Sequence, residues 1–158
     1  MFVWRLVCTS QEEIVEMVRL LIIEDDDVLA LQAQNWLSPV CSYIERTRSA
    51  SDGMKRLQRS SFDVAVVGSR LPDMSGGEFC RRVNNSNMFV PVIVISANKN
   101  MDEKVHALDA GAQDFIDMPD QLEELPARMR CLLRRYGRSN VTPMVVPAMS
   151  PVAVPFVT

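Results

Sequence analysis

The sequence has little of what most metal-binding and catalytic sites are made from. Its 158 residues include one histidine, and its four cysteines form no Cys-x-x-Cys pair. Such pairs are typical of zinc knuckles and redox motifs, so neither is expected, and free thiols in a reducing compartment are the simpler interpretation. The lone His106 has no evident partners for catalysis. We therefore predict no catalytic residue and no enzymatic activity.

The chain also lacks an excess of positive charge and a long apolar run. Its formal net charge is −3, which gives no electrostatic footprint for nucleic acid, so nucleic-acid binding by this chain is not expected. No apolar run reaches the roughly 18 residues that span a bilayer. The first ten residues make a poor signal peptide, because they offer no clean cleavage site. We expect a cytoplasmic protein with no membrane partner.

What the chain does have is a regular alternation of apolar strands and amphipathic segments from residue 19 onward. Its length suits one domain with a substantial core. Near-continuous apolar runs are typical of parallel strands that are buried on both faces, and the segments between them show helical spacing. Strands are predicted at residues 19–24, 40–45, 62–67, 91–96 and 112–116, and helices at residues 26–37, 51–58, 76–83, 101–110 and 121–135.

Five strands alternating with five helices predict an α/β fold with a doubly wound, five-stranded parallel sheet. In such sheets, ligand chemistry gathers in the crevice beyond the carboxyl ends of the strands. Four short segments lie at those ends: Glu24-Asp25-Asp26, Gly68-Ser69-Arg70, Ser96-Ala97 and Asp117-Met118-Pro119. No glycine-rich phosphate loop follows the first strand, which argues against a nucleotide- or flavin-binding enzyme.

Two flanks fall outside this alternation. Residues 1–17 are predicted to be an N-terminal extension, because Met17 looks like a natural start; a misassigned start or a small added helix would explain it. Residues 137–158 form a tail with prolines at four-residue intervals among Val and Met. Proline at that density forbids a helix and a central strand. We expect the tail to be extended or disordered.

Four segments together resemble one known family, the receiver domain of bacterial two-component response regulators. They are Ile22-Ile-Glu-Asp-Asp26, Arg70-Leu-Pro-Asp-Met-Ser-Gly76, Pro91-Val-Ile-Val-Ile-Ser-Ala97 and Gly111-Ala-Gln-Asp-Phe-Ile-Asp-Met-Pro119. They occur in the family's order and spacing, and the resemblance covers residues 18–136. It implies the flavodoxin-like receiver fold, (βα)5. The last predicted helix is most similar to the subfamily that carries a winged-helix DNA-binding domain, which residues 137–158 do not resemble.

The resemblance also implies a set of pocket residues. In this family an acid pair and an acceptor aspartate surround Mg²⁺, which neutralises the incoming phosphoryl group. Glu24 and Asp25 match the acid pair, and Gly68 matches the acceptor, which glycine cannot replace chemically. We therefore expect weak Mg²⁺ binding by Glu24 and Asp25 at most, and no other cofactor. A substitute acceptor, Ser69 or Asp73, is the alternative.

Three further positions belong to this resemblance. Met118 stands where the family has a lysine that pairs with phosphoryl oxygens, so the pocket would lose an ammonium as well as a carboxylate. Ser96 matches the switch hydroxyl and Phe115 the aromatic ring that moves with it. Without a phosphoryl oxygen to bond, the inward state of Ser96 loses its driving force. A strand-end serine bonded to backbone and a core phenylalanine are then the simpler interpretation.

The predicted fourth helix, fifth strand and fifth helix match the usual dimer face of the subfamily. Charges of both signs on such a face can pair across a two-fold axis, although a solvated surface explains them equally well. Pro126 departs from the family pattern; proline costs about 3 kcal/mol inside a helix but little in the first turn. The candidate residues are Lys104, Asp109, Asp114, Glu123, Glu124, Arg128 and Arg130.

The functional prediction is an atypical receiver, or pseudo-receiver, that acts as a phosphorylation-independent regulatory or protein-interaction module. Its expected partners are a histidine kinase, another regulator or a second copy of the chain. Two alternatives remain. One is a phosphorelay regulator with a substitute acceptor, and the other is the receiver half of a DNA-binding transcription regulator whose winged helix is missing.

Overall fold

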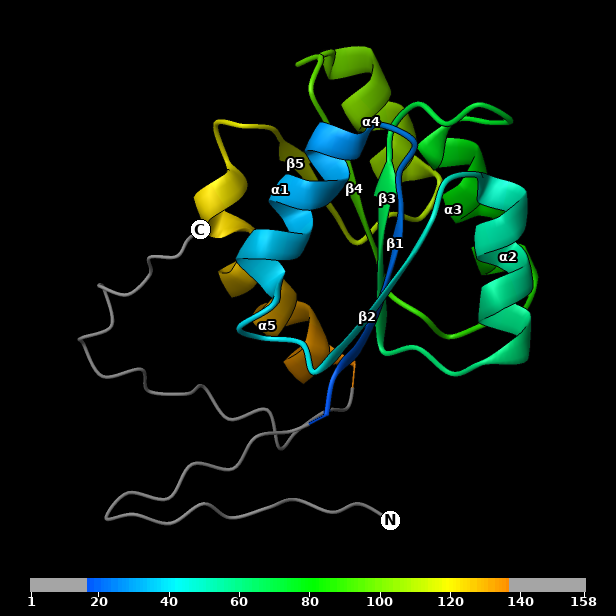
Figure 1. The fold of residues 1–158 in the computed structure, drawn as a ribbon. Helices are drawn as coiled ribbons and strands as arrows, with labels where there is room; N and C mark the ends of the chain where they lie inside the picture. The colour runs from blue at the N-terminus through cyan, green and yellow to red at the C-terminus, as the bar shows by residue number, and fades with distance from the viewer. Residues whose placement is uncertain (1–16, 137–158) are drawn as a thin grey trace, which may run out of the picture.

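Five parallel strands form one sheet in the order β2-β1-β3-β4-β5 (Figure 1). The computed structural model describes residues 17–136. Every residue of β3 and β4 is buried, as their near-continuous apolar sequences predict. The strands are β1 (Arg19–Ile23), β2 (Tyr43–Thr47), β3 (Val64–Gly68), β4 (Val92–Ser96) and β5 (Asp114–Asp117). The predicted doubly wound sheet is confirmed.

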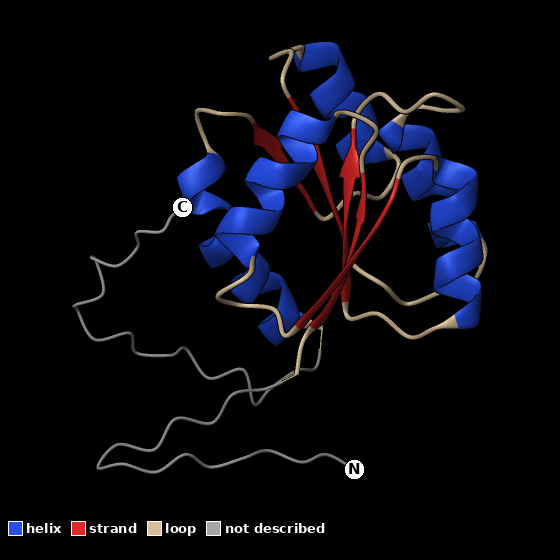
Figure 2. Ribbon diagram, in the orientation of Figure 1, coloured by secondary structure: helices blue, strands red, loops and turns tan. Residues whose placement is uncertain are grey.

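Helices cover both faces of the sheet (Figure 2). One apolar core lies between the sheet and helices α1 and α5, and a second lies between the sheet and helices α2, α3 and α4. The helices are α1 (Asp27–Leu37), α2 (Ala50–Arg59), α3 (Gly76–Asn85), α4 (Met101–Asp109) and α5 (Leu125–Arg135), the last preceded by a short 3-10 helix, η1 (Leu122–Glu124). This arrangement leaves the carboxyl ends of the central strands open to solvent-facing loops.

Two predicted elements near the amino end are displaced in the structure. The strand predicted at 40–45 lies at β2, because a turn that follows α1 holds Val40 and Cys41 through the carbonyl of Leu37. Helix α2 starts at Ala50, and its cap is Ser49, whose hydroxyl accepts a hydrogen bond from the backbone N–H of Asp52. Asp26 caps α1, since its carboxylate accepts from two backbone N–H groups of the first turn.

The carboxyl-terminal elements also differ from the prediction. The last strand lies at β5 instead of at 112–116, and the last helix is split into η1 and α5. Pro126 falls in the first turn of α5, where its missing N–H would have no helical partner in any case. The proline is therefore compatible with the helix.

Several predictions concern residues that the structure leaves undescribed. The predicted extension, apart from Met17, and the predicted tail lie outside residues 17–136, and so does Cys8. The other three cysteines are free thiols, with Cys41 and Cys80 buried and Cys131 exposed. Within residues 17–136, no helix combines the length and apolar character that a membrane crossing requires.

Candidate functional site

The candidate site lies at the carboxyl ends of β1, β3, β4 and β5. The parallel register pairs Gly68 with Ile95 and Ser96 with Asp117, so neighbouring strands end at nearly the same level. Glu24 follows the end of β1, which lies beside β3. The fold thus brings together the predicted pocket positions that are widely separated in the sequence.

Glu24 is a buried acid, with 3% of its surface exposed. Its Oε1 accepts a hydrogen bond from the backbone N–H of Asp26 at 3.0 Å. Burial raises the pKa of Glu24 above its ordinary value, while backbone N–H bonds from Asp26 and Asp25 oppose part of that rise. The guanidinium of Arg46 binds the backbone carbonyl of Glu24, with Nη2 at 2.8 Å, instead of the carboxylate. The buried carboxylate therefore has no ion-pair partner among the described residues.

The missing side chain of Gly68 makes room for that carboxylate. A Cβ atom on Gly68 would lie 2.8 Å from Cδ and 3.0 Å from Oε1 of Glu24, and closer still to Oε2. Carbon atoms in contact are normally about 3.5–4.0 Å apart. The Glu24 carboxylate thus occupies space that any larger residue at position 68 would claim. This relation depends on the rotamer of Glu24, so the sequence alone did not reveal it.

Asp25, the other acid of the predicted pair, is exposed. Mg²⁺ requires oxygen ligands in near-ideal octahedral geometry. Within residues 17–136, no three His, Cys, Asp or Glu side chains gather in a way that could hold a metal ion. One buried carboxylate that faces Gly68 and one exposed carboxylate do not fit the magnesium centre that the family implies. We therefore derive no chemical step through a metal.

Of the two candidate substitute acceptors, Asp73 has its side chain engaged in local structure. Both carboxylate oxygens of Asp73 accept hydrogen bonds at 2.9 Å, from the backbone N–H groups of Ala50 and Ser51. Burial would raise the pKa of Asp73, but these N–H bonds outweigh that effect and lower it below its usual range. Asp73 therefore helps to hold the first turn of α2. Ser69 is buried, and its backbone N–H donates to the carbonyl of Ile95 at 2.8 Å.

The predicted switch positions have ordinary structural contacts. The hydroxyl of Ser96 accepts a hydrogen bond from the backbone N–H of Asn98 at 3.2 Å. Phe115 is 2% exposed and belongs to the core beneath α2, α3 and α4. Met118 is also buried, and it packs in the opposite core, beneath α1 and α5. These contacts agree with a backbone-bonded serine and a core phenylalanine.

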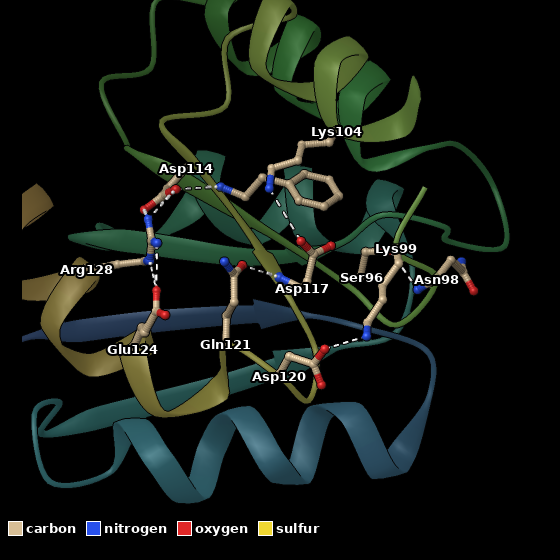
Figure 3. A network of polar contacts seen from close by, with 11 residues as sticks. Ser96, Asn98, Lys99, Lys104, Asp114, Asp117, Asp120, Gln121, Glu124 and Arg128 are labelled. Atoms are coloured by element: carbon tan, nitrogen blue, oxygen red, sulfur yellow. Dashed lines mark hydrogen bonds and ion pairs between the residues drawn. The ribbon is translucent and has the colours of Figure 1, made fainter. Parts of the chain in front are cut away.

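Two lysines lie near this edge of the sheet, although neither is on β5. Lys99 forms an ion pair with Asp120, and Lys104 Nζ lies 3.4 Å from Asp117 Oδ2 (Figure 3). The side-chain oxygen of Gln121 accepts from the backbone N–H of Asp117 at 2.8 Å. These residues line an open cavity of about 290 Å³. Sequence reasoning missed the pairs, because each lysine lies before β5 in the chain, just ahead of α4 or within it, more than ten residues from its partner at or just beyond the end of β5.

Several charges of the predicted dimer face are paired within the chain. Arg128 contacts Asp114 at 3.0 Å and Glu124 at 2.6 Å (Figure 3). Asp109 and Glu123 are exposed, whereas Arg130 is half-buried. The same face carries three exposed apolar residues of α4 at helical spacing, which the sequence analysis did not single out: Met101, Val105 and Leu108. The face therefore combines internally paired charges with unburied apolar side chains.

A protein-family model described as "Response regulator receiver domain" matches residues 20–130. This chain belongs to that family. The four sequence segments predict a receiver domain of two-component signalling, and the family match confirms that prediction.

Curated relatives of this receiver domain are longer proteins. This chain is 33% identical to "Response regulator MprA" of Mycobacterium sp. (strain KMS), in a match that covers 75% of this chain and 51% of the relative. It is 32% identical to "Two-component response regulator PhoP" of Pseudomonas aeruginosa, covering 75% and 52%. It is 30% identical to "Transcriptional regulatory protein BasR" of Escherichia coli (strain K12), covering 82% and 58%. The chain spans about half the length of the curated relatives that it matches.

Solved structures share the same fold. A putative response regulator from Chloroflexus aurantiacus matches with a TM-score of 0.71 at 25% identity, covering 76% of this chain and all of that one. HP1043, described as an orphan response regulator of Helicobacter pylori, matches with a TM-score of 0.63 at 29% identity, covering 74% and 97%. These likenesses agree with the flavodoxin-like receiver fold.

We predict that Glu24→Gln stabilises the receiver domain at neutral pH. Because the folded-state pKa of Glu24 is raised above 4.5, ionisation of Glu24 costs stability as the pH rises through that pKa, and nothing is lost below about pH 4.5, where both states are protonated. Glutamine keeps the oxygen that bonds the N–H of Asp26 and carries no charge. Urea unfolding followed by circular dichroism should show a gain at pH ~7 that disappears near pH ~4.

Asp25→Asn is the matched control for this prediction, since it removes the neighbouring but exposed carboxylate. It should show no comparable pH-dependent gain in the free energy of unfolding. An equal gain in both variants, or no gain in Glu24→Gln, would show that burial of Glu24 does not penalise its charged form.

Proposed function

We propose that this protein is a pseudo-receiver, a receiver domain that regulates by contact with partner proteins and not by phosphoryl transfer. The observation that carries the proposal is the position of the Glu24 carboxylate, which fills the space beside Gly68 where an acceptor side chain would project. Phosphoryl transfer depends on positioning a nucleophile and on neutralising the charge that moves. At the end of β3 this chain has Gly68, which offers no side chain as a nucleophile, and the buried carboxylate of Glu24 faces it.

The charges around the site support the same proposal. A phosphoryl group carries about −1.5 to −2 at pH 7, and beside the unpaired carboxylate of Glu24 it would be repelled. Met118, which stands where the family has a lysine, is buried in the core. Lys99 and Lys104 are already paired with carboxylates of the β5 side. Neither lysine is therefore unpaired and free to offset an incoming phosphate at Gly68.

A receiver of this kind would be switched by its partners. The hydroxyl of Ser96 already bonds the backbone, and Phe115 is already in the core. A phosphoryl oxygen would therefore change the conformations of these two residues little. A ligand shifts a conformational equilibrium only by its differential affinity for the two states, and here a protein partner would supply it. We propose a histidine kinase or another regulator of the cytoplasm as that partner, with no cofactor required.

The proposal predicts that the chain takes up no phosphoryl group. Incubation with acetyl phosphate and Mg²⁺, followed by intact-mass measurement, should leave the mass unchanged, because no carboxylate stands at the end of β3. The Gly68→Asp/Met118→Lys variant, run in parallel, restores the carboxylate and the ammonium at these positions. An adduct on the wild-type chain that Ser69→Ala or Asp73→Asn abolishes would contradict the proposal and identify the substitute acceptor.

A second candidate output is the control of transcription through a homodimer. The name of the Escherichia coli relative favours it, and so does the face made by α4, β5 and α5. That face exposes Met101, Val105 and Leu108, and burying such a patch against a second copy would remove apolar surface from water. The ion pairs of Arg128 would then lie at the rim, where they could exchange partners across the two-fold axis.

The dimer proposal predicts that a charge on α4 abolishes self-association. Val105→Glu places a carboxylate in the apolar patch, so sedimentation equilibrium should show monomers, whereas the wild-type chain should show a dimer. Val28→Glu is the control, because Val28 is an exposed apolar residue of α1 on another face. A wild-type monomer at all concentrations, or equal effects of the two variants, would rule out this face.

A further inference from the structure

A basic groove lies between α2 and β2, the edge strand of the sheet, and neither Glu24 nor Gly68 lines it. Its volume is about 560 Å³. We call it the β2–α2 groove and define it by the side chains that matter here: Arg46, Thr47, Arg48, Lys55, Arg56 and Arg59. Ligand pockets of about 300–1,000 Å³ hold small molecules, so the groove is far larger than a single ion needs.

The groove concentrates positive charge in a chain that is negative overall. Three carboxylates lie in or beside the groove, against its five cationic side chains. Asp52 is part of the lining, Asp27 pairs with Arg46 and Arg48, and Glu45 pairs with Arg56. Two positive charges are therefore left over, against a net charge of −3 for the whole chain.

Two of the five cations, Lys55 and Arg59 of α2, take part in none of these ion pairs. Both are exposed, and neither forms a hydrogen bond or an ion pair with another described residue. Residues four apart lie on the same face of a helix, so the two side chains rise together along one wall of the groove. They are available to a ligand without breaking any contact of the fold.

Thr47 adds an independent sign of a ligand. It is 8% exposed, it lines the groove, and its hydroxyl has no hydrogen-bond partner among residues 17–136. Leaving a buried hydroxyl without a partner costs free energy, so such groups are rare in folded proteins and call for an explanation. A hydroxyl can donate to an anionic oxygen. Next to it, Arg46 is held in place by the carbonyl of Glu24 and the carboxylate of Asp27.

We propose that the β2–α2 groove binds a small molecule that carries two or more phosphate groups, of the size of a nucleotide. Arginine side chains present a planar fork of donors that matches phosphate oxygens, and lysine adds a point charge. The positive charge is confined to one groove, which favours a compact polyanion over a nucleic-acid backbone, whose binding needs many phosphate contacts. Because neither Glu24 nor Gly68 lines the groove, this proposal stands independently of the pseudo-receiver proposal.

Titration calorimetry with inorganic triphosphate and with a nucleoside triphosphate tests the proposal on the whole chain. We expect saturable binding of at least one of them, weakened about tenfold or more in Lys55→Gln/Arg59→Gln, because two bonds to charged groups are lost. The control is Arg130→Gln/Arg135→Gln, which removes the same charge from α5, where neither arginine forms a hydrogen bond or an ion pair with another described residue. Tighter binding of the nucleoside triphosphate would assign part of the site to the base and sugar.

Thr47→Val provides a second readout. Removing an unsatisfied buried hydroxyl should raise the melting temperature, yet the same change should weaken triphosphate binding if the hydroxyl contacts the ligand. The proposal is overturned if neither triphosphate binds saturably, or if the α2 and α5 variants lose affinity equally. It is also overturned if a polyglutamate peptide or a single-stranded oligonucleotide binds more tightly than either triphosphate.

Discussion

The candidate site depends on one close approach, between the carboxylate of Glu24 and the bare Cα of Gly68. A side chain at position 68 would overlap that carboxylate, and the carboxylate in turn is held by the N–H of Asp26, which caps α1. The end of β1, the end of β3 and the start of α1 thus form one interlocked unit. A side chain at position 68 would require the Glu24 carboxylate to move.

The electrostatics of this unit bear on its purpose. A buried acid with a raised pKa and no cationic partner lowers stability at neutral pH, and such arrangements cluster at functional sites. In a phosphate-accepting receiver, clustered acids serve to hold a metal ion. In this chain the acids do not form that set, and the neighbouring lysines are paired elsewhere. No ion-pair partner among residues 17–136 offsets the cost of ionising Glu24, and this is consistent with the pseudo-receiver that we propose.

Much of the fold could be predicted from the sequence, because β3 and β4 are buried on both faces and appear as unbroken apolar runs. β2 was misplaced for the opposite reason: it is a partly exposed edge strand, whose polar residues give no clear period. The start of α2, predicted at residue 51 and found at Ala50, likewise does not depend on local sequence alone, because Asp73, from the loop after β3, binds the N–H of Ser51.

The candidate site was less predictable than the fold. The strand ends could be assigned from order and spacing, so Glu24, Gly68 and Ser96 were expected at one edge. Their contacts could not be assigned, because the inward rotamer of Glu24 depends on an absent side chain on another strand. The β2–α2 groove escaped notice for a similar reason: its cations come from two elements and form no run in the sequence.

The most direct test of the central claim is an amide NMR spectrum of the chain with and without Mg²⁺ and beryllium fluoride, a mimic of the phosphoryl group. If the Glu24 carboxylate fills the acceptor space and no carboxylate replaces it, the amide signals of Gly68, Ser96 and Phe115 should not move. Saturable shifts at these three residues would contradict the account, because they would show that the site still binds a phosphoryl-like group and passes the signal to the switch positions.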